Sequence, residues 1–550
     1  MQVVTGVTGS LGAHAVANLV AQASVRKVYC LVRADSKQSA RYRVRESLRE
    51  RLVYHQLSLP SRSKIIALPS NFSDAHLGLA QSDYDDISSS ITHLLHLAWS
   101  VNFNKGLESF EADCIAGAKN LMNLCLASKR PQPASFNFCS SVSATAATPG
   151  DVDPEALPES YSYAQGMGYA QSKLVTEHLC DRASRQTSLR TRVLRVGQII
   201  GDTQHGVWNN TEAIPLIFQT AKTVGALPEL DETPYWLPVD IVAKACSEIA
   251  CSGAESGVMN VVNDKAFHWS RDLLPLLREA GLQFETVPQQ EWIRRLRASE
   301  PDPSKNPPIK LVDFFASKYD NDKPRRSLAH ATSRAQGSSP SLQNAGTIDK
   351  SLIRKIVSQL EAKWSAGSLS ADEPAVIVVG GPCGSGKSTI ARALADKLSL
   401  PMIEGDDMHS KTARERMGSQ IPLTDADRMS WLAHIRGAAI DRLNTTKAPA
   451  VLVTCSALRS IYRQELRTLQ EIAGFRTLFV MLETESRDEL KTRLSLREDH
   501  YMAPEMVDAQ VELLEAAQDS EVDVVPVDAA RDLEEVLSEC QDILQGMVKI

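Results

Sequence analysis

Residues 381–388 constrain the fold of this chain more strongly than any other stretch. They read Gly-Pro-Cys-Gly-Ser-Gly-Lys-Ser and match the spacing G-x-x-x-x-G-K-[ST] at every fixed position. An apolar run at 375–379 precedes them, and a helical pattern over 389–398 follows. This strand–loop–helix order lets backbone N–H groups surround phosphates at a helix N-terminus. The sequence therefore predicts a nucleoside-triphosphate site here, rather than a chance glycine-rich turn.

Individual residues of this loop have expected roles. Lys387 would reach the β- and γ-phosphate oxygens of ATP, and the Ser388 hydroxyl would bind Mg²⁺. Lys387 is thus a candidate both for catalysis and for nucleotide binding. The residues expected to contact the nucleotide are Gly381, Cys383, Gly384, Ser385, Gly386, Lys387, Ser388 and Thr389.

Length and composition set limits on the rest. A chain of 550 residues is too long for one core, so two or three domains are expected. The net charge of −7 gives no electrostatic basis for binding nucleic acid or an anionic membrane. No apolar run reaches the length of a membrane span. The ten cysteines form no C-x-x-C pair and indicate reduced thiols in a cytoplasmic protein.

A second glycine-rich turn lies at the start of the chain, between a short apolar strand and a helical pattern over 13–23. Such a turn lets the backbone approach a pyrophosphate, although tight strand–helix turns also use glycine for structural reasons alone. The next strand, 27–32, ends at Arg33, where a basic residue suits the 2′-phosphate of NADP; Asp35 lies nearby. The candidate dinucleotide contacts are Gly6, Thr8, Gly9, Ser10, Leu11, Gly12 and Arg33.

Strand and helix patterns alternate through this first part of the chain, which predicts an α/β fold with a Rossmann-type, doubly wound parallel sheet. Ser140 and Ser141 directly follow a strand at 134–139, and Tyr169 and Lys173 share one face of a later helix. An ammonium beside a phenol stabilises the phenolate, which lowers the tyrosine pKa and makes it a proton donor near neutral pH. A serine hydroxyl could hold a carbonyl oxygen meanwhile. A Tyr–Lys pair at this spacing is also common on protein surfaces.

Several blocks in order resemble the thioester reductase domain of carboxylate reductases and fungal reducing synthetases, a branch of the extended short-chain dehydrogenases/reductases. The resemblance covers residues 1–318. The matching blocks are 5–12, 31–34, 96–103, 168–173, 195–202, 206–209 and 236–240.

This resemblance implies hydride transfer from NADPH to a carrier-bound acyl thioester. Tyr169 would be the acid, Lys173 its partner and Ser141 the oxyanion donor. In that family an adenylating domain and a carrier precede the reductase, whereas Met1 here begins almost inside the first strand. We therefore expect the acyl group to come from another protein, or the chain to be a fragment.

The apolar periodicity stops between residues 319 and 350. This segment is rich in Ser, Pro, Gly and basic residues, including Lys323-Pro-Arg-Arg326. Such a composition predicts a flexible linker, with a docking signal in the basic cluster as the alternative. A second domain of the α/β P-loop type would then span 351–550.

Two adjacent carboxylates follow the second strand of this domain. Asp406 and Asp407 lie where substrate and Mg²⁺ meet in small kinases, so either could orient or deprotonate an attacking hydroxyl. An Asp-rich loop that caps the next helix is the structural alternative.

The later blocks resemble the gluconokinase family of small P-loop carbohydrate kinases, over about residues 374–545. They are 405–409, 422–428, 455–459 with 462–463, and 497–502 with Gln510. The resemblance implies phosphorylation of D-gluconate by ATP. Its implied catalytic residues are Lys387, Asp406 and Asp407. Its implied substrate-binding residues are His409, Arg459, Arg463, Arg497 and Gln510.

The sugar-acid side departs from the family pattern at Ser410, Ala413, Gln420 and Ser430, whereas the ATP loop is intact. We therefore expect a fusion of an NADPH-dependent reductase with a gluconokinase-like kinase, acting on small molecules. Three alternatives stay open. The kinase alone could be active beside a non-catalytic reductase half; the reductase alone could be active in a secondary-metabolite pathway; or the fusion could be accidental. The sequence does not indicate an oligomeric state.

Overall fold

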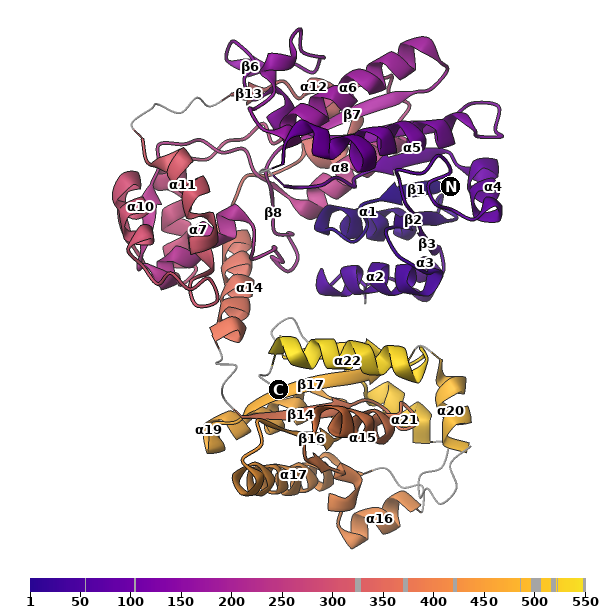
Figure 1. Cartoon of the computed structure of the whole chain (residues 1–550), viewed down its shortest axis with the longest axis vertical. Coiled ribbons are helices and arrows are strands. Elements are labelled where there is room, and N and C mark those ends of the chain that lie inside the picture. Colours follow the sequence, from indigo (N-terminus) through magenta and orange to yellow (C-terminus); the bar gives the residue numbers. More distant parts are fainter. Residues whose placement is uncertain are drawn as a thin grey trace. The chain divides into compact units, whose positions relative to one another are not determined.

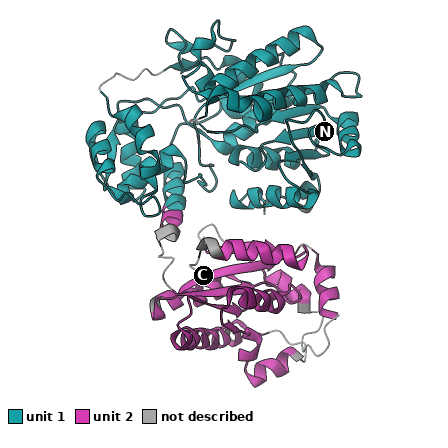
Figure 2. Cartoon of the chain, viewed as in Figure 1, with its two compact units in different colours: residues 1–360 teal, residues 361–550 magenta. Residues whose placement is uncertain are grey.

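The computed structural model describes residues 1–54, 56–102, 105–321, 328–368, 374–418, 423–484, 486–495, 506–515, 521 and 523–547. Contacts divide the chain into two compact units, 1–360 and 361–550, which are described separately (Figure 2). In the described part of the chain, no helix is long and apolar enough to cross a membrane.

A seven-stranded parallel sheet forms the centre of the first unit, with the order β11-β7-β5-β4-β1-β2-β3 (Figure 1). This confirms the predicted α/β class with a parallel, doubly wound sheet. Its strands are β1 Gln2–Thr5, β2 Val28–Val32, β3 Ile65–Pro69, β4 His93–His96, β5 Ser135–Ser141, β7 Thr191–Val196 and β11 Gly257–Val261.

Helices cover both faces of this sheet. Neighbouring residues of each strand point to opposite faces, so they pack into different hydrophobic clusters. Val4 and Cys30 pack into one hydrophobic cluster with α1, α2 and α8, and Val3 and Leu31 pack into another with α4, α5 and α6. The helices of this core are α1 Ser10–Ala21, α2 Lys37–Glu50, α3 Leu59–Arg62, α4 Gln81–Ser90, α5 Gly117–Leu126, α6 Gly168–Gln186 and α8 Val239–Cys251.

Smaller elements complete the first unit. Short parallel pairs join β8 to β10, β9 to β12 and β6 to β13. The strands are β6 Val152–Asp153, β8 Ile199–Ile200, β9 Ala226–Glu229, β10 Leu237–Pro238, β12 Glu285–Pro288 and β13 Ala329–His330. The remaining α-helices are α7 Ala213–Thr223, α9 Leu274–Glu279, α10 Gln289–Arg297, α11 Val312–Tyr319, α12 Ser333–Ser338 and α13 Pro340–Gln343.

The segment predicted as a flexible linker differs in the structure from residue 328 onward. The Glu155 carboxylate accepts hydrogen bonds from the backbone N–H groups of Arg334 and Ala335. The Glu248 carboxylate accepts from the hydroxyls of Ser339 and Ser341. These backbone N–H groups and serine hydroxyls are bound by carboxylates far away in the sequence, which composition alone does not reveal. The basic cluster 323–326 lies outside the described residues.

Helix α14, Lys350–Ser368, continues from this segment, and its first half packs on the first unit. Lys355 Nζ donates to the carbonyl oxygen of Thr203 at 2.7 Å. A Cβ atom on Gly206 would lie 2.5 Å from the backbone nitrogen of Ile356, so glycine permits this close approach.

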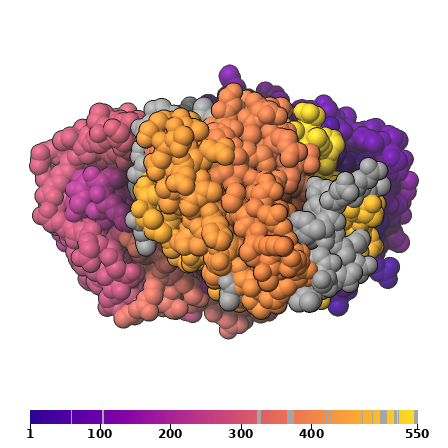
Figure 3. Space-filling model, turned by 90° about the horizontal axis from the view of Figure 1, so that it is seen from below, coloured from indigo at the N-terminus to yellow at the C-terminus, as the bar shows by residue number. Residues whose placement is uncertain are grey.

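The second unit is a five-stranded parallel sheet with the order β15-β16-β14-β17-β18. Its strands are β14 Ala375–Gly380, β15 Met402–Ile403, β16 Ala450–Thr454, β17 Arg476–Glu483 and β18 Val524–Asp528. Its helices are α15 Lys387–Leu398, α16 Lys411–Gly418, α17 Asp425–Thr446, α18 Ser460–Arg467, α19 Leu469–Ala473, α20 Arg487–Ser495, α21 Met506–Leu513 and α22 Leu533–Met547. In the space-filling view of Figure 3, residues of the second unit run from orange to yellow.

Candidate active sites

The glycine turn after β1 has the geometry of a dinucleotide-binding turn. Gly6 has φ +73°, and Gly9 N donates to its carbonyl oxygen at 3.0 Å. A Cβ atom on Gly12 would lie 2.1 Å from the same oxygen, so only glycine fits there. The other candidate contacts, Thr8, Ser10 and Leu11, lie half-buried where α1 begins. The backbone therefore leaves room for a pyrophosphate at the N-terminus of α1.

Basic side chains stand at the end of β2. The Arg33 side chain is 87% exposed and its Nη2 lies 4.0 Å from Oδ2 of Asp113. Arg43, on α2, donates from Nη1 to the Arg33 carbonyl oxygen. Sequence reasoning found Arg33 from its position but missed Arg43, because helix α2 brings it back to the strand end.

Ser141, Tyr169 and Lys173 meet beyond the carboxyl end of β5. Ser141 closes that strand and hydrogen-bonds to Tyr169, while α6 begins at Gly168 and carries the other two residues. Ser143 donates from its hydroxyl to Ser141 Oγ at 3.0 Å. The structure thus brings the three predicted residues together.

The pKa of Tyr169 is shifted in the direction opposite to the one expected from the sequence. Burial raises the pKa of Tyr169 above its usual range, and the hydrogen bond to Ser141 acts in the opposite direction. Burial lowers the pKa of Lys173 to about 8. Its Nζ donates to the Cys139 carbonyl oxygen at 2.6 Å and lies 5.7 Å from the centre of the Tyr169 ring. The expected lowering of the tyrosine pKa by Lys173 is not seen, because desolvation of the phenol dominates.

The two neighbouring serines have different surroundings, because only Ser140 belongs to a buried ionic network. Ser140 Oγ donates to Glu177 at 2.5 Å, and Arg195 donates to both oxygens of the same carboxylate. Arg195 also donates to Asp153. Ser140 is therefore held in the core, which leaves Ser141 to face Tyr169.

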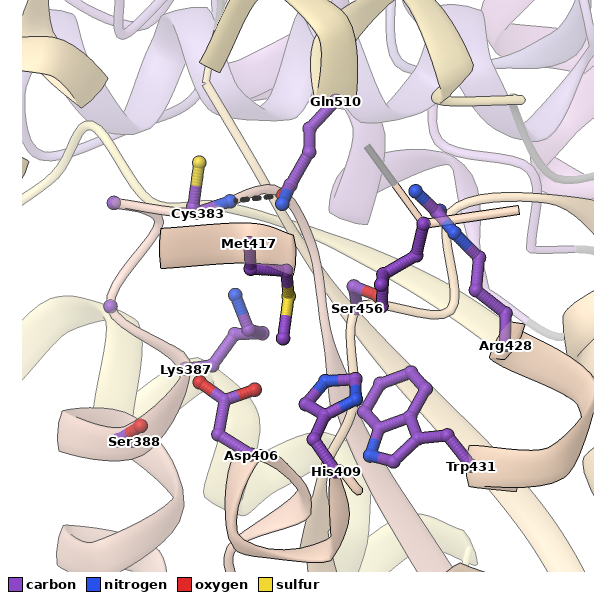
Figure 4. A pocket seen from close by; sticks show the side chains of 13 residues that line it. Cys383, Lys387, Ser388, Asp406, His409, Met417, Arg428, Trp431, Ser456 and Gln510 are labelled. Carbon is purple, nitrogen blue, oxygen red and sulfur yellow. Dashed lines mark hydrogen bonds between the residues drawn. The ribbon is translucent and has the colours of Figure 1, made fainter. Parts of the chain in front are cut away.

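In the second unit, a pocket opens at the phosphate loop (Figure 4). It encloses about 740 Å³, including its opening to solvent. Gly381, Gly384 and Gly386 have φ +130°, +79° and +92°, conformations that favour glycine. The Ser385 hydroxyl is buried and finds no hydrogen-bond partner among the residues that the structure describes. These features fit an oxygen-rich anion such as a triphosphate. The lining residues are Cys383, Gly384, Gly386, Lys387, Ser388, Asp406, His409, Met417, Leu423, Arg428, Trp431, Ser456 and Gln510.

Of the two candidate carboxylates, Asp406 lines the pocket and Asp407 does not. Asp406 lies there beside Lys387 and Ser388, whereas Asp407 is exposed. His409 also lines the pocket and stacks on Trp431 at 4.3 Å between ring centres. Burial lowers the pKa of His409, so the imidazole is neutral. Within the described part of the chain, its Nδ1 has no hydrogen-bond partner.

The other residues predicted from the sequence fall into different places. Gln510 lines the pocket and accepts a 2.8 Å hydrogen bond from Cys383 N. Arg463 is buried and bound to Glu521, and Arg459 pairs with Asp425 and Glu515, so neither lines the pocket. Thr389, on α15, is exposed, and Arg497 lies outside the described residues.

Sequence reasoning missed part of the pocket wall. Met417, Leu423 and Trp431 supply apolar surface, and Arg428 and Ser456 supply polar groups. Arg428 belongs to the 422–428 block, so its position was a signal that could have identified it.

Two family models match the chain, one described as male sterility protein over residues 4–246 and one described as AAA domain over residues 376–519. A non-reducing polyketide synthase of Emericella nidulans is 33% identical over 371 residues, which cover 64% of this chain. The chain spans only 15% of that relative's length.

Two solved structures are also similar. The terminal R domain from the myxalamid PKS-NRPS biosynthetic pathway matches with a TM-score of 0.58 and 23% identity, covering 66% of this chain and 90% of that one. A gluconokinase from Sinorhizobium meliloti is 35% identical, with a TM-score of 0.28, covering 32% of this chain and 95% of that one. The two parts of the chain are thus similar to different proteins: the first unit shares the fold of a solved R domain, and residues 376–519 match a model described as AAA domain.

Proposed function

We propose that the chain is a bifunctional enzyme. Its first unit would reduce an acyl thioester, or a related carbonyl compound, with NADPH. Its second unit would transfer the γ-phosphate of ATP to D-gluconate. The observation that carries this proposal is that each unit brings a nucleotide-binding turn and acid–base side chains to the carboxyl ends of one parallel sheet.

In the first unit, the strand order reverses between β1 and β4; the turn follows β1, and β5 is the neighbour of β4. NADPH would supply the hydride. Ser141 would hold the carbonyl oxygen, and Tyr169 would give it a proton. The position of Tyr169 supports this role, because its side chain hydrogen-bonds to Ser141, the group that would hold the same carbonyl oxygen. Arg33 would select NADPH over NADH by pairing with the 2′-phosphate.

In the second unit, Lys387 and the loop N–H groups would hold the phosphates, and Ser388 would bind Mg²⁺. Asp406 would accept the proton of the attacking hydroxyl, since its carboxylate lines the same pocket. Arg428 supports an acidic substrate: it faces the pocket and, among the described residues, its side chain forms no ion pair. A guanidinium in this position can bind a carboxylate.

A carrier protein would be a further partner of the chain in this proposal. The resemblance of the first unit suggests that its substrate would be an acyl group tethered to a carrier protein. Free acyl-pantetheine thioesters are therefore the simplest probes of this site.

The test uses the purified full chain and two panels. Acyl-pantetheine thioesters and aldehydes are offered with NADPH or NADH, and gluconate and related sugar acids with ATP and Mg²⁺. NADPH oxidation with a thioester and ADP formation with gluconate are the expected results. NADPH binding without turnover on any member would refute the reductase activity and favour a binding module. ADP formation with another sugar acid alone would refute gluconate as the substrate.

A further inference from the structure

Lys173 is enclosed by aromatic rings. Its Nζ lies 4.2 Å from the centre of the Trp99 ring and 4.8 Å from that of Phe138, with Tyr169 at 5.7 Å. Its 2.6 Å hydrogen bond to the Cys139 carbonyl oxygen fixes the ammonium between these rings. Trp99 provides the nearest ring face.

The surroundings hold little negative charge that could balance this ammonium. Burial raises the pKa values of the Cys139 and Cys114 thiols and lowers that of His96 to about 3, so all three are neutral. The Glu177 carboxylate is already bound by Arg195. Among the described residues, Lys173 forms no ion pair. Together with the Cys139 carbonyl oxygen, the negative faces of the aromatic rings are therefore the groups that favour its charged form.

Trp99 is anchored so that its face meets Lys173. Its Nε1 donates to Ser172 Oγ at 3.2 Å, and Ser172 Oγ donates to the Tyr169 carbonyl oxygen at 2.8 Å. The ring also packs on Phe138 at 5.2 Å. The indole is thus tied to α6, the helix that carries both Tyr169 and Lys173.

We propose that Trp99 is a positioning residue of the reductase site, whose indole face takes the place of a counter-ion and keeps the Lys173 ammonium charged beside Tyr169. This inference rests on the proposed reductase function. It assigns a role to a residue that does not itself touch the reacting carbonyl. The desolvated setting is the one in which cation–π attraction is strongest.

Three variants test the proposal in the full chain. Trp99→Leu removes the ring face, Trp99→Phe keeps a smaller one, and Ser172→Ala removes only the anchor. The lysine Cε resonances of ¹³C-labelled protein are titrated against pH, and Lys173 is assigned by the loss of its signal in Lys173→Met. NADPH turnover is measured over the same pH range, and NADPH binding at pH 6.5 checks that each variant is folded.

Trp99→Leu should lower the pKa of Lys173 by about one unit. Turnover should then fall roughly tenfold at pH 9 and much less at pH 6.5, since one pKa unit changes the charged fraction about tenfold above both pKa values. Trp99→Phe should show only a small part of this loss of turnover. The loss in Ser172→Ala should be larger than in Trp99→Phe and smaller than in Trp99→Leu.

An unchanged Lys173 titration in Trp99→Leu, or a loss of turnover that is equal at every pH, would overturn the proposal. If the wild-type protein reduces no substrate, the reductase function fails instead. The NMR titration still decides the role of Trp99 in that case, because it does not depend on turnover.

Discussion

At the scale of single residues, Asp406 and Asp407 are neighbours with different surroundings. Asp406 lines the phosphate-loop pocket and Asp407 is exposed. If Asp406 is the general base, Asp406→Asn should reduce kcat for gluconate phosphorylation by about 10² to 10⁴. Asp407→Asn is the matched control and should change kcat by less than about threefold, on the scale of an exposed substitution. Equal losses in the two variants, measured as ADP formation, would contradict this assignment.

The charge of Lys173 predicts a pH dependence of the reductase. Its pKa of about 8 means that the ammonium dominates below pH 8 and is lost as pH rises through this value. NADPH turnover with a saturating aldehyde should therefore decline above pH 8, by roughly tenfold per further unit. Tyr169 should not limit this range, because burial raises its pKa. A rate that stays constant to pH 9.5 would show that the lysine charge is not required.

At the scale of elements, a buried ion pair holds α18 against the segment before β18. Arg463 Nε and Nη2 donate to the two Glu521 oxygens at 2.8 and 2.6 Å, and both side chains are nearly inaccessible. Glu521→Gln should destabilise the second unit by about 3–5 kcal/mol, because it leaves a buried guanidinium without its partner charge.

Thermal unfolding of the full chain checks this prediction. The unfolding transition of the second unit should move to lower temperature. The temperature at which NADPH binding is lost should stay the same, because the first unit is unchanged. Glu415→Gln, which alters an exposed glutamate of α16, is the control. A change no larger than that of Glu415→Gln would mean that the pair contributes little.

The same elements explain how much the sequence could predict. Glycines at 6, 12, 381, 384 and 386 identify both nucleotide turns, because positive φ angles or close backbone contacts require them. Helical spacing placed Tyr169 and Lys173 together. The sequence could not show that Arg463 is a core residue rather than a pocket residue, because its partner Glu521 is 58 positions away. The packing of 328–350 depends on Glu155 and Glu248, which are even more remote in sequence from the groups that they bind.

At the scale of the whole molecule, the chain contains two compact units, and each holds its own candidate nucleotide-binding turn. Each turn lies within its own unit, as do the candidate catalytic residues. A substitution in one site should therefore leave the chemistry of the other site unchanged. The two proposed activities should therefore be separable in one polypeptide.

The measurement that tests the central claim most directly compares wild type, Tyr169→Phe and Lys387→Ala as full chains. Thioester-dependent NADPH oxidation and gluconate-dependent ADP formation are followed on the same preparations. We predict that wild type performs both reactions, that Tyr169→Phe loses only NADPH oxidation, and that Lys387→Ala loses only ADP formation. Absence of either reaction in wild type, or survival of both in a variant, would contradict the account.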